Sequence, residues 1–269
     1  KLIQLSYKLR SKQEEIKVKT TELYLEKLEY FSKKYLPILS NISKFIAKLD
    51  FYKSNAKTSI IYGYNKPNID LSEDNSFIDS KGLRHPIIER IQNDIEYVPN
   101  DVILGKNNLN GMLLYGCNAV GKSSLMKAVG LNLIMAQAGM YVAAESFTYK
   151  PFNYIFTRIS DNDNIFKGQS SFAVEMSELR SILKRSDNKS IILGDELCSG
   201  TESISAQSIF AASVIKLASR NVNFIFATHL HELYKMPKIK ELGNVSSFHL
   251  KVIFDERTKK LIYDRKLEL

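Results

Sequence analysis

Residues 116–123 have the sequence GCNAVGKS, which fits the pattern G-x-x-x-x-G-K-[ST] at every fixed position. The apolar run 112–115 comes directly before it, and apolar residues at helical spacing follow it at positions 125, 126, 129 and 133. A strand, a glycine-rich loop and a helix in this order form a P-loop, whose backbone N–H groups and helix N-terminus surround nucleotide phosphates. The stretch therefore predicts an α/β fold that binds a nucleotide.

The residue types of this loop have separate expected roles. Lys122 is expected to reach the β- and γ-phosphates, where it serves both binding and catalysis, and the Ser123 hydroxyl is expected to bind Mg²⁺. The remaining expected phosphate contacts come from the loop around them, at Gly116, Asn118, Ala119, Val120, Gly121 and Ser124. A nucleoside triphosphate with Mg²⁺ is therefore the expected ligand.

A second apolar strand, 190–194, ends in Asp195 and Glu196 about seventy residues after the P-loop. This is the arrangement of a Walker B motif, in which the aspartate binds Mg²⁺ and the following glutamate orients the attacking water. Because loops at the carboxyl ends of parallel strands meet in one crevice, we expect both carboxylates to face Lys122.

A third apolar strand, 224–227, delivers His229 to the same edge of the sheet. His229 is therefore expected to contact the γ-phosphate, while the alternative role of an isolated histidine is a structural hydrogen bond. A zinc site is not expected, because His229 and His231 are only two residues apart and no cluster of Cys or His completes a ligand set.

The composition is that of a soluble protein with an ordinary core, since 44% of the 269 residues are hydrophobic. No apolar stretch is long enough to cross a bilayer, and the charged N-terminus does not resemble a signal peptide. The net charge of +9 favours a polyanionic partner. Two cysteines, Cys117 and Cys198, indicate a reducing, intracellular compartment rather than a disulfide scaffold. The chain begins with Lys1 rather than Met, so we expect a partial chain.

The N-terminal part is expected to be helical. Residues 1–35 contain no Gly or Pro, and apolar residues recur every seven positions at 2, 9, 16, 23 and 30. Such a helix would be on the order of 50 Å long, which suits a strut, although half of a coiled coil has the same pattern. Pro37 is expected to end or kink it, and a second helical face follows at 38–49.

Three regions follow from these patterns. We expect a helical segment at 1–62, a turn-rich linker at 63–82 and an α/β domain at 83–269. Within the α/β domain the predicted strands are 112–115, 153–159, 190–194, 222–227, 248–254 and 261–266. The predicted helices are 122–138, 171–185, 203–219 and 230–235.

Six motifs in order resemble the ATPase domain of the MutS family. They are RHPIIE at 84–89, the P-loop, FTRI at 156–159, QSSFAVEM at 169–176, DEL at 195–197 with GT at 200–201, and ATHLHEL at 227–233. The resemblance covers about 83–267 and implies an ABC-ATPase-like head with a mixed, mainly parallel sheet flanked by helices. The helical segment before it resembles the returning lever of the same family, so that the chain would start after the DNA-clamping region and stop before the C-terminal helices.

The resemblance also implies ATP as the nucleotide and a second subunit of the same type, expected to be an identical copy, as a partner. Ser170 would be offered in trans to the partner's γ-phosphate, while by its position alone it is also an N-cap for the helix at 171–185. Tyr97 matches an aromatic that stacks on adenine, and Arg265 matches the opposite adenine contact; without the resemblance each is an ordinary surface side chain. DNA is the implied partner, mainly through regions outside this chain, and no membrane is expected.

The chain departs from the family pattern in places. Cys117 and Val120 replace Pro and Gly in the P-loop, where neither side chain is required, and Cys198-Ser199 and Ser205-Ala206 stand for Gly-Arg and Asp-Gly after the Walker B strand. Binding and hydrolysis of ATP are therefore safer expectations than the coupling between subunits. The chain resembles a divergent branch of the family.

The expected function is control of a DNA clamp by ATP hydrolysis at a dimer interface, in mismatch repair or another DNA-linked task. One alternative is the ABC-type head of a chromosome-structure protein or a transporter, but these have an L-S-G-G-Q-type signature that this chain lacks. A RecA-like helicase would leave the long helix unexplained. A third alternative is not an enzyme: a module that holds nucleotide and dimerises with negligible hydrolysis.

Overall fold

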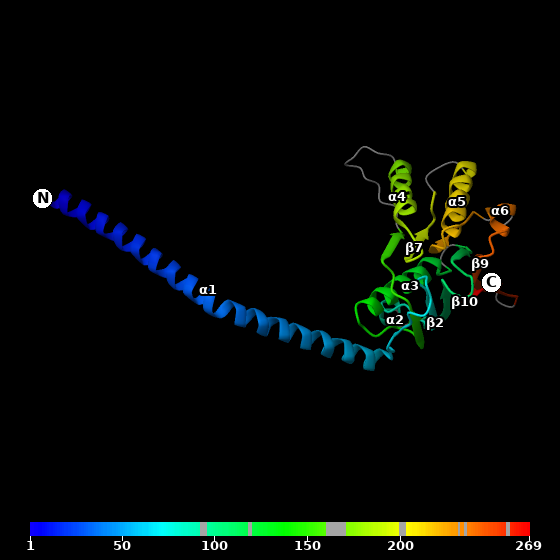
Figure 1. Cartoon of the computed structure of the whole chain (residues 1–269), viewed down its shortest axis with the longest axis horizontal. Coiled ribbons are helices and arrows are strands. Elements are labelled where there is room, and N and C mark those ends of the chain that lie inside the picture. The colour runs from blue at the N-terminus through cyan, green and yellow to red at the C-terminus, as the bar shows by residue number, and fades with distance from the viewer. Residues whose placement is uncertain are drawn as a thin grey trace. The chain divides into compact units, whose positions relative to one another are not determined.

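The computed structural model describes residues 1–91, 96–117, 120–159, 171–198, 203–230, 232–233, 236–256 and 259–269. They form a mixed α/β structure with two β-sheets and several helices (Figure 1). The chain consists of two units, Lys1–Lys57 and Thr58–Leu269. None of the helices in the described ranges is both long and apolar enough to cross a membrane.

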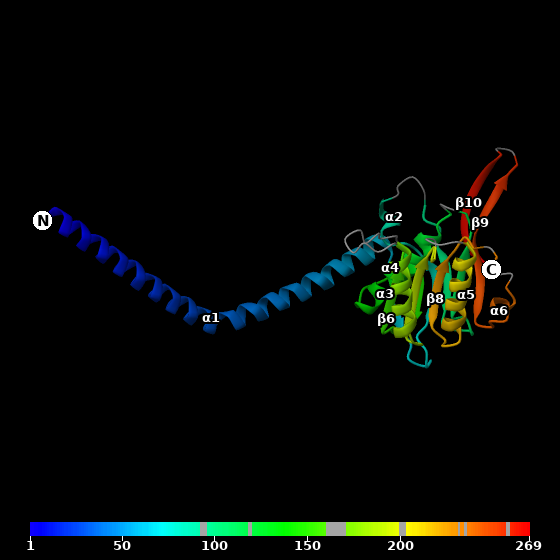
Figure 2. The same ribbon diagram turned by 90° about the horizontal axis from the view of Figure 1, so that it is seen from above.

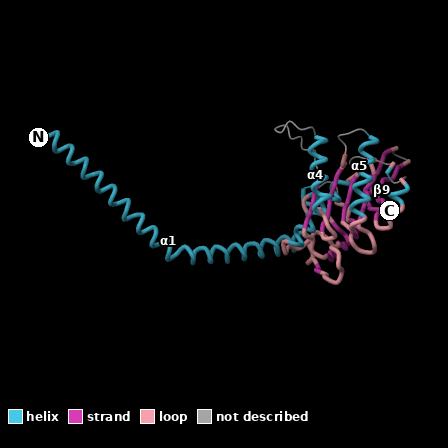
Figure 3. Tube along the Cα trace, turned by 45° about the horizontal axis from the view of Figure 1, so that its top comes forward, coloured by secondary structure: helices cyan, strands magenta, loops and turns pink. Residues whose placement is uncertain are grey.

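The first unit is formed by α1 (Leu2–Tyr62), a helix of 61 residues whose last residues belong to the second unit. The sequence analysis expected Pro37 to end or kink the helix. Pro37 does not end it, because it lies inside a single helix. A proline within a helix removes one backbone hydrogen bond and bends the axis without necessarily ending the helix. Figures 2 and 3 show α1 as a continuous helix that changes direction about halfway along.

A six-stranded sheet forms the centre of the second unit, in the order β10-β9-β4-β8-β7-β6. Its strands are β4 (Gly111–Tyr115), β6 (Tyr154–Arg158), β7 (Ser190–Asp195), β8 (Asn223–Ala227), β9 (Val245–Asp255) and β10 (Lys260–Glu268). Neighbouring strands from β6 to β9 are parallel, and β10 pairs antiparallel with β9 as an edge hairpin (Figure 2). All six strands predicted from the sequence are confirmed.

A smaller sheet was missed by the sequence analysis. It has the order β1-β5-β2-β3, from β1 (Asn68–Ile69), β2 (Ile78–Leu83), β3 (Asn100–Leu104) and β5 (Ser146–Tyr149). Residues 63–82, for which we expected a linker, contribute β1 and most of β2 to this sheet, and Phe77 and Ile78 are fully buried. Their turn-forming residues obscured two short strands that are stabilised by packing with distant parts of the chain.

The hydrophobic core has two layers, one on each face of the large sheet. Alternate residues of a strand point to opposite faces. Leu114 and Leu193 pack with α3 (Lys122–Gln137) and the small sheet, whereas Leu113 and Ile192 pack with α4 (Ser171–Arg185) and α5 (Ser203–Ala218). The large sheet is therefore covered on both faces, and α4 and α5 lie on the same side of it (Figure 2).

The predicted helices at 122–138, 171–185 and 203–219 are confirmed as α3, α4 and α5. Of the helix predicted at 230–235, residue 230 is not helical and residue 232 lies in a turn, whereas residue 233 belongs to a 3₁₀ helix and its N–H donates to the Leu230 carbonyl at 3.1 Å; residues 231, 234 and 235 lie outside the described residues. A short helix, α6 (Pro237–Lys240), begins later, because Pro237 has the fixed φ and missing N–H that suit a first helical position. One further short helix, α2 (Ile88–Ile91), precedes β3.

Buried asparagines join the two sheets at the end opposite the P-loop. The fully buried Asn223 on β8 donates from Nδ2 to the Ser76 carbonyl at 2.6 Å, just before β2. Its Oδ1 accepts a hydrogen bond from Asn110 Nδ2 at 3.2 Å. Since a buried polar group costs free energy unless it is hydrogen-bonded, this side chain holds the sheets in one arrangement.

We predict that Asn223→Ala lowers the free energy of unfolding by about 2–4 kcal/mol, because it leaves the buried Ser76 carbonyl without its donor and removes one of the two acceptors of the Asn110 amide. Urea denaturation followed by circular dichroism measures the change. The matched control is Asn68→Ala on the exposed strand β1, which should change the free energy of unfolding by less than about 0.5 kcal/mol. Equal effects of the two substitutions would contradict a role for Asn223 in joining the sheets.

Candidate nucleotide-binding site

The P-loop lies between β4 and α3 as the sequence predicts. Gly116 and Gly121 both have positive φ, 139° and 113°, which glycine adopts without the steric cost that other residues meet. Gly121 is the N-cap of α3, so the loop ends at the positive end of a helix dipole. Asn118 and Ala119 of the predicted set lie outside the described residues.

Lys122 is the first residue of α3 and its side chain folds back over the loop. It is only 5% exposed, and its Nζ donates to the Gly116 carbonyl at 2.6 Å and to the Cys117 carbonyl at 3.1 Å. Burial lowers the pKa of the Lys122 ammonium, while the negative charges of Glu196 and Asp195 act in the opposite direction. The partners of this cation are therefore neutral carbonyls, which an anion in the loop can replace.

Ser123 and Asp195 are in direct contact although they are 72 residues apart in sequence. The Ser123 hydroxyl donates to Asp195 Oδ2. Ser123 lies in the first turn of α3 and Asp195 is the last residue of β7, so both are at the carboxyl edge of the parallel strands. The structure thus brings together the two side chains that the sequence analysis assigned to Mg²⁺.

Glu196 and His229 form a second pair at this edge. His229 Nε2 lies 2.8 Å from Glu196 Oε1, and the two side chains are 37% and 49% exposed, His229 first. Glu196 has a φ of 50°, and its backbone N–H donates to the Ala227 carbonyl at 3.0 Å, which ties the loop after β7 to the end of β8. The carboxylate is therefore held next to an imidazole at a place that water can reach.

The described residues contain no group of three or more His, Cys, Asp or Glu side chains arranged to hold a metal ion. Mg²⁺ usually keeps several waters and takes one or two protein oxygens together with substrate phosphates. A hydroxyl and a carboxylate in contact, as at Ser123 and Asp195, fit that kind of ion.

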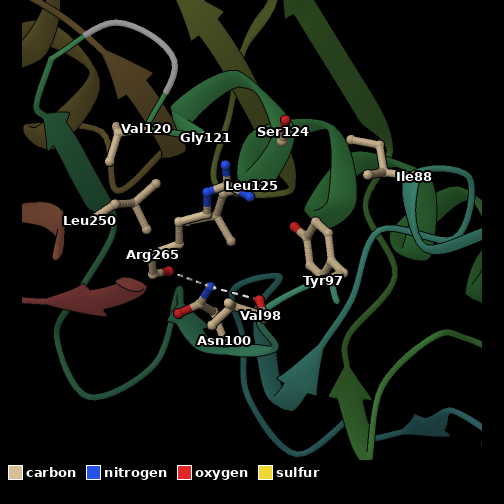
Figure 4. Close-up of a pocket in the computed structure, with 10 residues that line it drawn as sticks. All are labelled: Ile88, Tyr97, Val98, Asn100, Val120, Gly121, Ser124, Leu125, Leu250 and Arg265. Carbon is tan, nitrogen blue, oxygen red and sulfur yellow. Dashed lines mark hydrogen bonds between the residues drawn. The ribbon is translucent and has the colours of Figure 1, made fainter. Parts of the chain in front are cut away.

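A cavity of about 190 Å³ lies beside the P-loop (Figure 4). It is lined by Val120, Gly121, Ser124 and Leu125 from the loop and α3, by Ile88, Tyr97, Val98 and Asn100 from the segment before β4, and by Leu250 and Arg265 from the β9–β10 hairpin. Tyr97 and Arg265, which the sequence analysis assigned to the nucleotide base, thus share one cavity with the loop.

Burial sets the properties of both of these side chains. It raises the pKa of Tyr97 to about 12, with a contribution from the charge of Glu89 and an opposing one from Arg265. The phenol is therefore neutral at physiological pH. Arg265 Nε is buried and has no hydrogen-bond partner among the described residues. A buried donor without a partner is costly, and an acceptor atom on a ligand in this cavity would satisfy it.

Sequence reasoning missed Asn100, which shapes this cavity. Its Nδ2 donates to the Arg265 carbonyl at 3.1 Å, and its Oδ1 accepts the Leu267 N–H at 2.7 Å. Arg265 lies at an irregularity in the β9–β10 pairing and has a φ of 60°. Nothing in the sequence links two residues 165 positions apart, so this contact became visible only in three dimensions.

A second residue without an assigned role is Glu175 on α4, which is only 4% exposed. Its Oε1 accepts the backbone N–H of Cys198 at 2.7 Å. The sequence signal was a charged residue among the apolar positions of a predicted helix. Ser170, the residue expected to act in trans, lies outside the described residues, as does His231.

Comparison with known proteins identifies the family. The family model described as MutS domain V matches residues 112–269. A mutS homolog of Acanthamoeba polyphaga mimivirus is 36% identical over 302 residues, covering 99% of this chain and 27% of the relative. A mitochondrial DNA mismatch repair protein mutS homolog of Sarcophyton glaucum is 38% identical over 271 residues, covering 98% of this chain and 26% of the relative.

A bacterial relative points to the same family. The DNA mismatch repair protein MutS of Fusobacterium nucleatum is 38% identical over 267 residues, covering 95% of this chain and 29% of the relative. The chain thus spans between 26% and 29% of the length of these relatives. By the match to its residues 112–269, the chain belongs to the MutS family and contains the family's domain V.

Proposed function

We propose that this chain is the ATPase part of a MutS-type protein, which binds and hydrolyses MgATP at a dimer interface and so controls a DNA clamp. The observation that supports this most is the contact between Ser123 and Asp195 beside Lys122. It combines a cation for phosphate with two oxygen ligands for a divalent ion at the N-terminus of one helix. Mismatch repair is the pathway named for the relatives, and the proposal also covers a related DNA-maintenance pathway.

In this proposal Ser123 and Asp195 hold Mg²⁺, which supplies positive charge against the phosphate oxygens. Lys122 exchanges its two carbonyl partners for phosphate oxygens, which are stronger acceptors because they are charged. Gly121 brings the N-terminus of α3 close to the same anion. The chain's contribution is thus fixed positive charge and fixed N–H donors in a preformed loop.

Hydrolysis also needs a water molecule held in line for attack. Glu196 is the residue proposed for this role, because its carboxylate lies at the exposed edge of the site. His229 is proposed to keep that carboxylate in place and to contact the γ-phosphate. Glu196 accepts a hydrogen bond from the attacking water, and general base and positioning effects of this kind contribute large rate factors.

Tyr97 and Arg265 are proposed to bind the adenine base in the neighbouring cavity. The neutral Tyr97 ring offers a flat surface for stacking, and the Arg265 guanidinium, which also lines the cavity, has a buried Nε donor without a partner among the described residues. The cavity adjoins Val120 and Gly121, so a base there is close to the phosphate loop. This arrangement supports a nucleotide rather than inorganic phosphate as the ligand.

A chain of contacts within the second unit supports a lever role for α1. Arg84 Nη2 donates to the carbonyls of Tyr62 and Gly63, at 3.2 and 3.3 Å, where α1 ends. The Arg84 carbonyl in turn accepts Asn132 Nδ2 of α3 at 2.9 Å. The helix that follows the P-loop is therefore linked to the end of α1, and we propose that this link transmits the nucleotide state to residues 1–62.

The charge distribution supports DNA as the partner. Residues 1–57 contain 13 lysines and arginines and 6 aspartates and glutamates, which accounts for seven of the nine net positive charges of the chain. Basic surfaces attract the phosphate backbone without reading its sequence. We therefore propose DNA as a partner. From the family of the chain we also propose an identical second subunit, in a reducing intracellular compartment that contains DNA.

We predict that Glu196→Gln lowers kcat for ATP about 10²–10³-fold and leaves the affinity for MgATP within about threefold, because the amide keeps the shape but cannot accept a proton. Steady-state ATPase assays with and without DNA, together with equilibrium binding, measure both quantities. Glu241→Gln at the exposed end of α6 is the matched control and should leave both unchanged.

Normal turnover by Glu196→Gln would remove the proposed role of this carboxylate. A wild-type chain that binds MgATP but turns over none, with or without DNA, would instead favour the nucleotide-holding module among the alternatives.

We predict that Tyr97→Ala raises the dissociation constant for ATP roughly tenfold through lost stacking, whereas Tyr97→Phe, which keeps the ring, stays within about twofold of the wild type. Binding of inorganic triphosphate should be the same for all three proteins, because it has no base. Equilibrium titration with both ligands provides the comparison. Equal loss of ATP and triphosphate binding in Tyr97→Ala would show that the ring supports the loop rather than the base.

A further inference from the structure

The side chain of Glu175 is a buried polar group that the proposed chemistry does not use. The residue lies near the start of α4, is 4% exposed, and accepts the Cys198 backbone N–H at 2.7 Å on Oε1. A buried carboxylate is stable only if hydrogen bonds replace its water. A short bond from a backbone amide to a carboxylate is among the stronger hydrogen bonds in proteins.

The segment that Glu175 contacts has an unfavourable backbone conformation. Glu196 and Cys198 have φ angles of 50° and 66°, in the left-handed region that residues with a Cβ atom avoid. Such conformations persist where surrounding contacts enforce them. Cys198 and Leu197 are also buried, at 1% and 5% exposed, so the segment 196–198 is packed as well as bent.

Two backbone hydrogen bonds hold this segment from opposite ends. The Glu196 N–H donates to the Ala227 carbonyl at 3.0 Å, and the Cys198 N–H donates to Glu175 at 2.7 Å. Between these two points the Glu196 carboxylate is directed to His229, at 2.8 Å. Removing one of the two bonds would let the backbone relax toward ordinary φ values and turn the Glu196 side chain away.

We propose that Glu175 is a positioning residue for Glu196: it holds the strained segment 196–198 from α4, so that the Glu196 carboxylate stays beside His229. The consequence for catalysis rests on the proposed function, whereas the effect on the backbone does not. Because α4 provides Glu175 and β7 provides Glu196, any displacement of α4 changes the orientation of the catalytic carboxylate.

The cysteine beside this carboxylate remains uncharged. Burial raises the pKa of the Cys198 thiol to about 11, and the negative charge of Glu175 adds to the effect. At neutral pH the thiol is therefore protonated, and no second negative charge competes with Glu175 for the backbone amide.

Three substitutions at position 175 separate the effect of side-chain length from the effect of charge. Glu175→Gln keeps an oxygen acceptor at the same distance, Glu175→Asp keeps the charge but shortens the side chain by one methylene, and Glu175→Ala removes both. If Glu175 acts by its hydrogen bond to Cys198, kcat stays within about threefold in the Gln variant and falls about tenfold or more in the Asp and Ala variants. The affinity for MgATP stays within about twofold in all of them.

Amide hydrogen exchange of the peptide that contains 196–198 provides a readout that does not need turnover. We expect exchange at Cys198 to be faster in the Asp and Ala variants and close to the wild type in the Gln variant. The control is Ile182→Ala, another buried residue of the same helix, seven positions further along it. It should lower thermal stability but change neither the exchange at Cys198 nor kcat.

A double variant tests the backbone strain at Cys198 directly. Glycine adopts positive φ at little cost, so Cys198→Gly in the Glu175→Ala background should restore part of the lost kcat, by about threefold or more. No recovery, together with lowered MgATP affinity, would indicate a general structural role and overturn the proposal. Unchanged kcat and unchanged exchange in Glu175→Ala would also overturn it. If the wild-type chain shows no turnover, the proposed function fails, and the exchange data alone decide whether Glu175 holds the segment.

Discussion

The hydrogen bond from the Ser123 hydroxyl to the Asp195 carboxylate joins the two halves of the candidate site. One partner lies in the first turn of the helix after the P-loop and the other ends the strand β7, so the bond fixes the distance between α3 and the carboxyl edge of the sheet. The neighbouring Lys122 is held by the loop's own carbonyls. The positive and negative groups of the site are thus arranged by the protein alone, which is the condition for electrostatic preorganisation.

The rest of the second unit makes this arrangement possible. Parallel strands with apolar residues on both faces require cover on both sides, and α3 with the small sheet on one face and α4 with α5 on the other provide it. The same elements reach the site: α4 through Glu175, and α3 through the P-loop on one side and through Asn132 and Arg84 toward the end of α1 on the other. Packing and site geometry therefore depend on the same helices.

The sequence alone predicted the helices and strands that are marked by patterns of neighbouring residues. The strands that end in Asp195 and Ala227 and the helix after Gly121 were predicted because apolar runs and glycine spacing mark them. The small sheet was not, because β1, β2, β3 and β5 are short and lie among turn residues. Of these strands β2, β3 and β5 pack with α3, and β1 is held by its pairing with β5. Contacts such as Asn100 with Arg265 and Glu175 with Cys198 join residues far apart in sequence, and no local pattern reveals them. The substitution of Cys198 for glycine, noted from the resemblance, acquires a physical meaning only with its φ of 66°.

Isothermal titration calorimetry of the folded chain with ATP, in Mg²⁺ and in chelator, tests the central claim most directly. The account predicts binding that is stronger in Mg²⁺, and predicts that Asp195→Asn removes this dependence on Mg²⁺ while the nucleotide still binds. A folded wild-type chain without measurable affinity for ATP in Mg²⁺, or one whose affinity is the same with and without the ion, would contradict it.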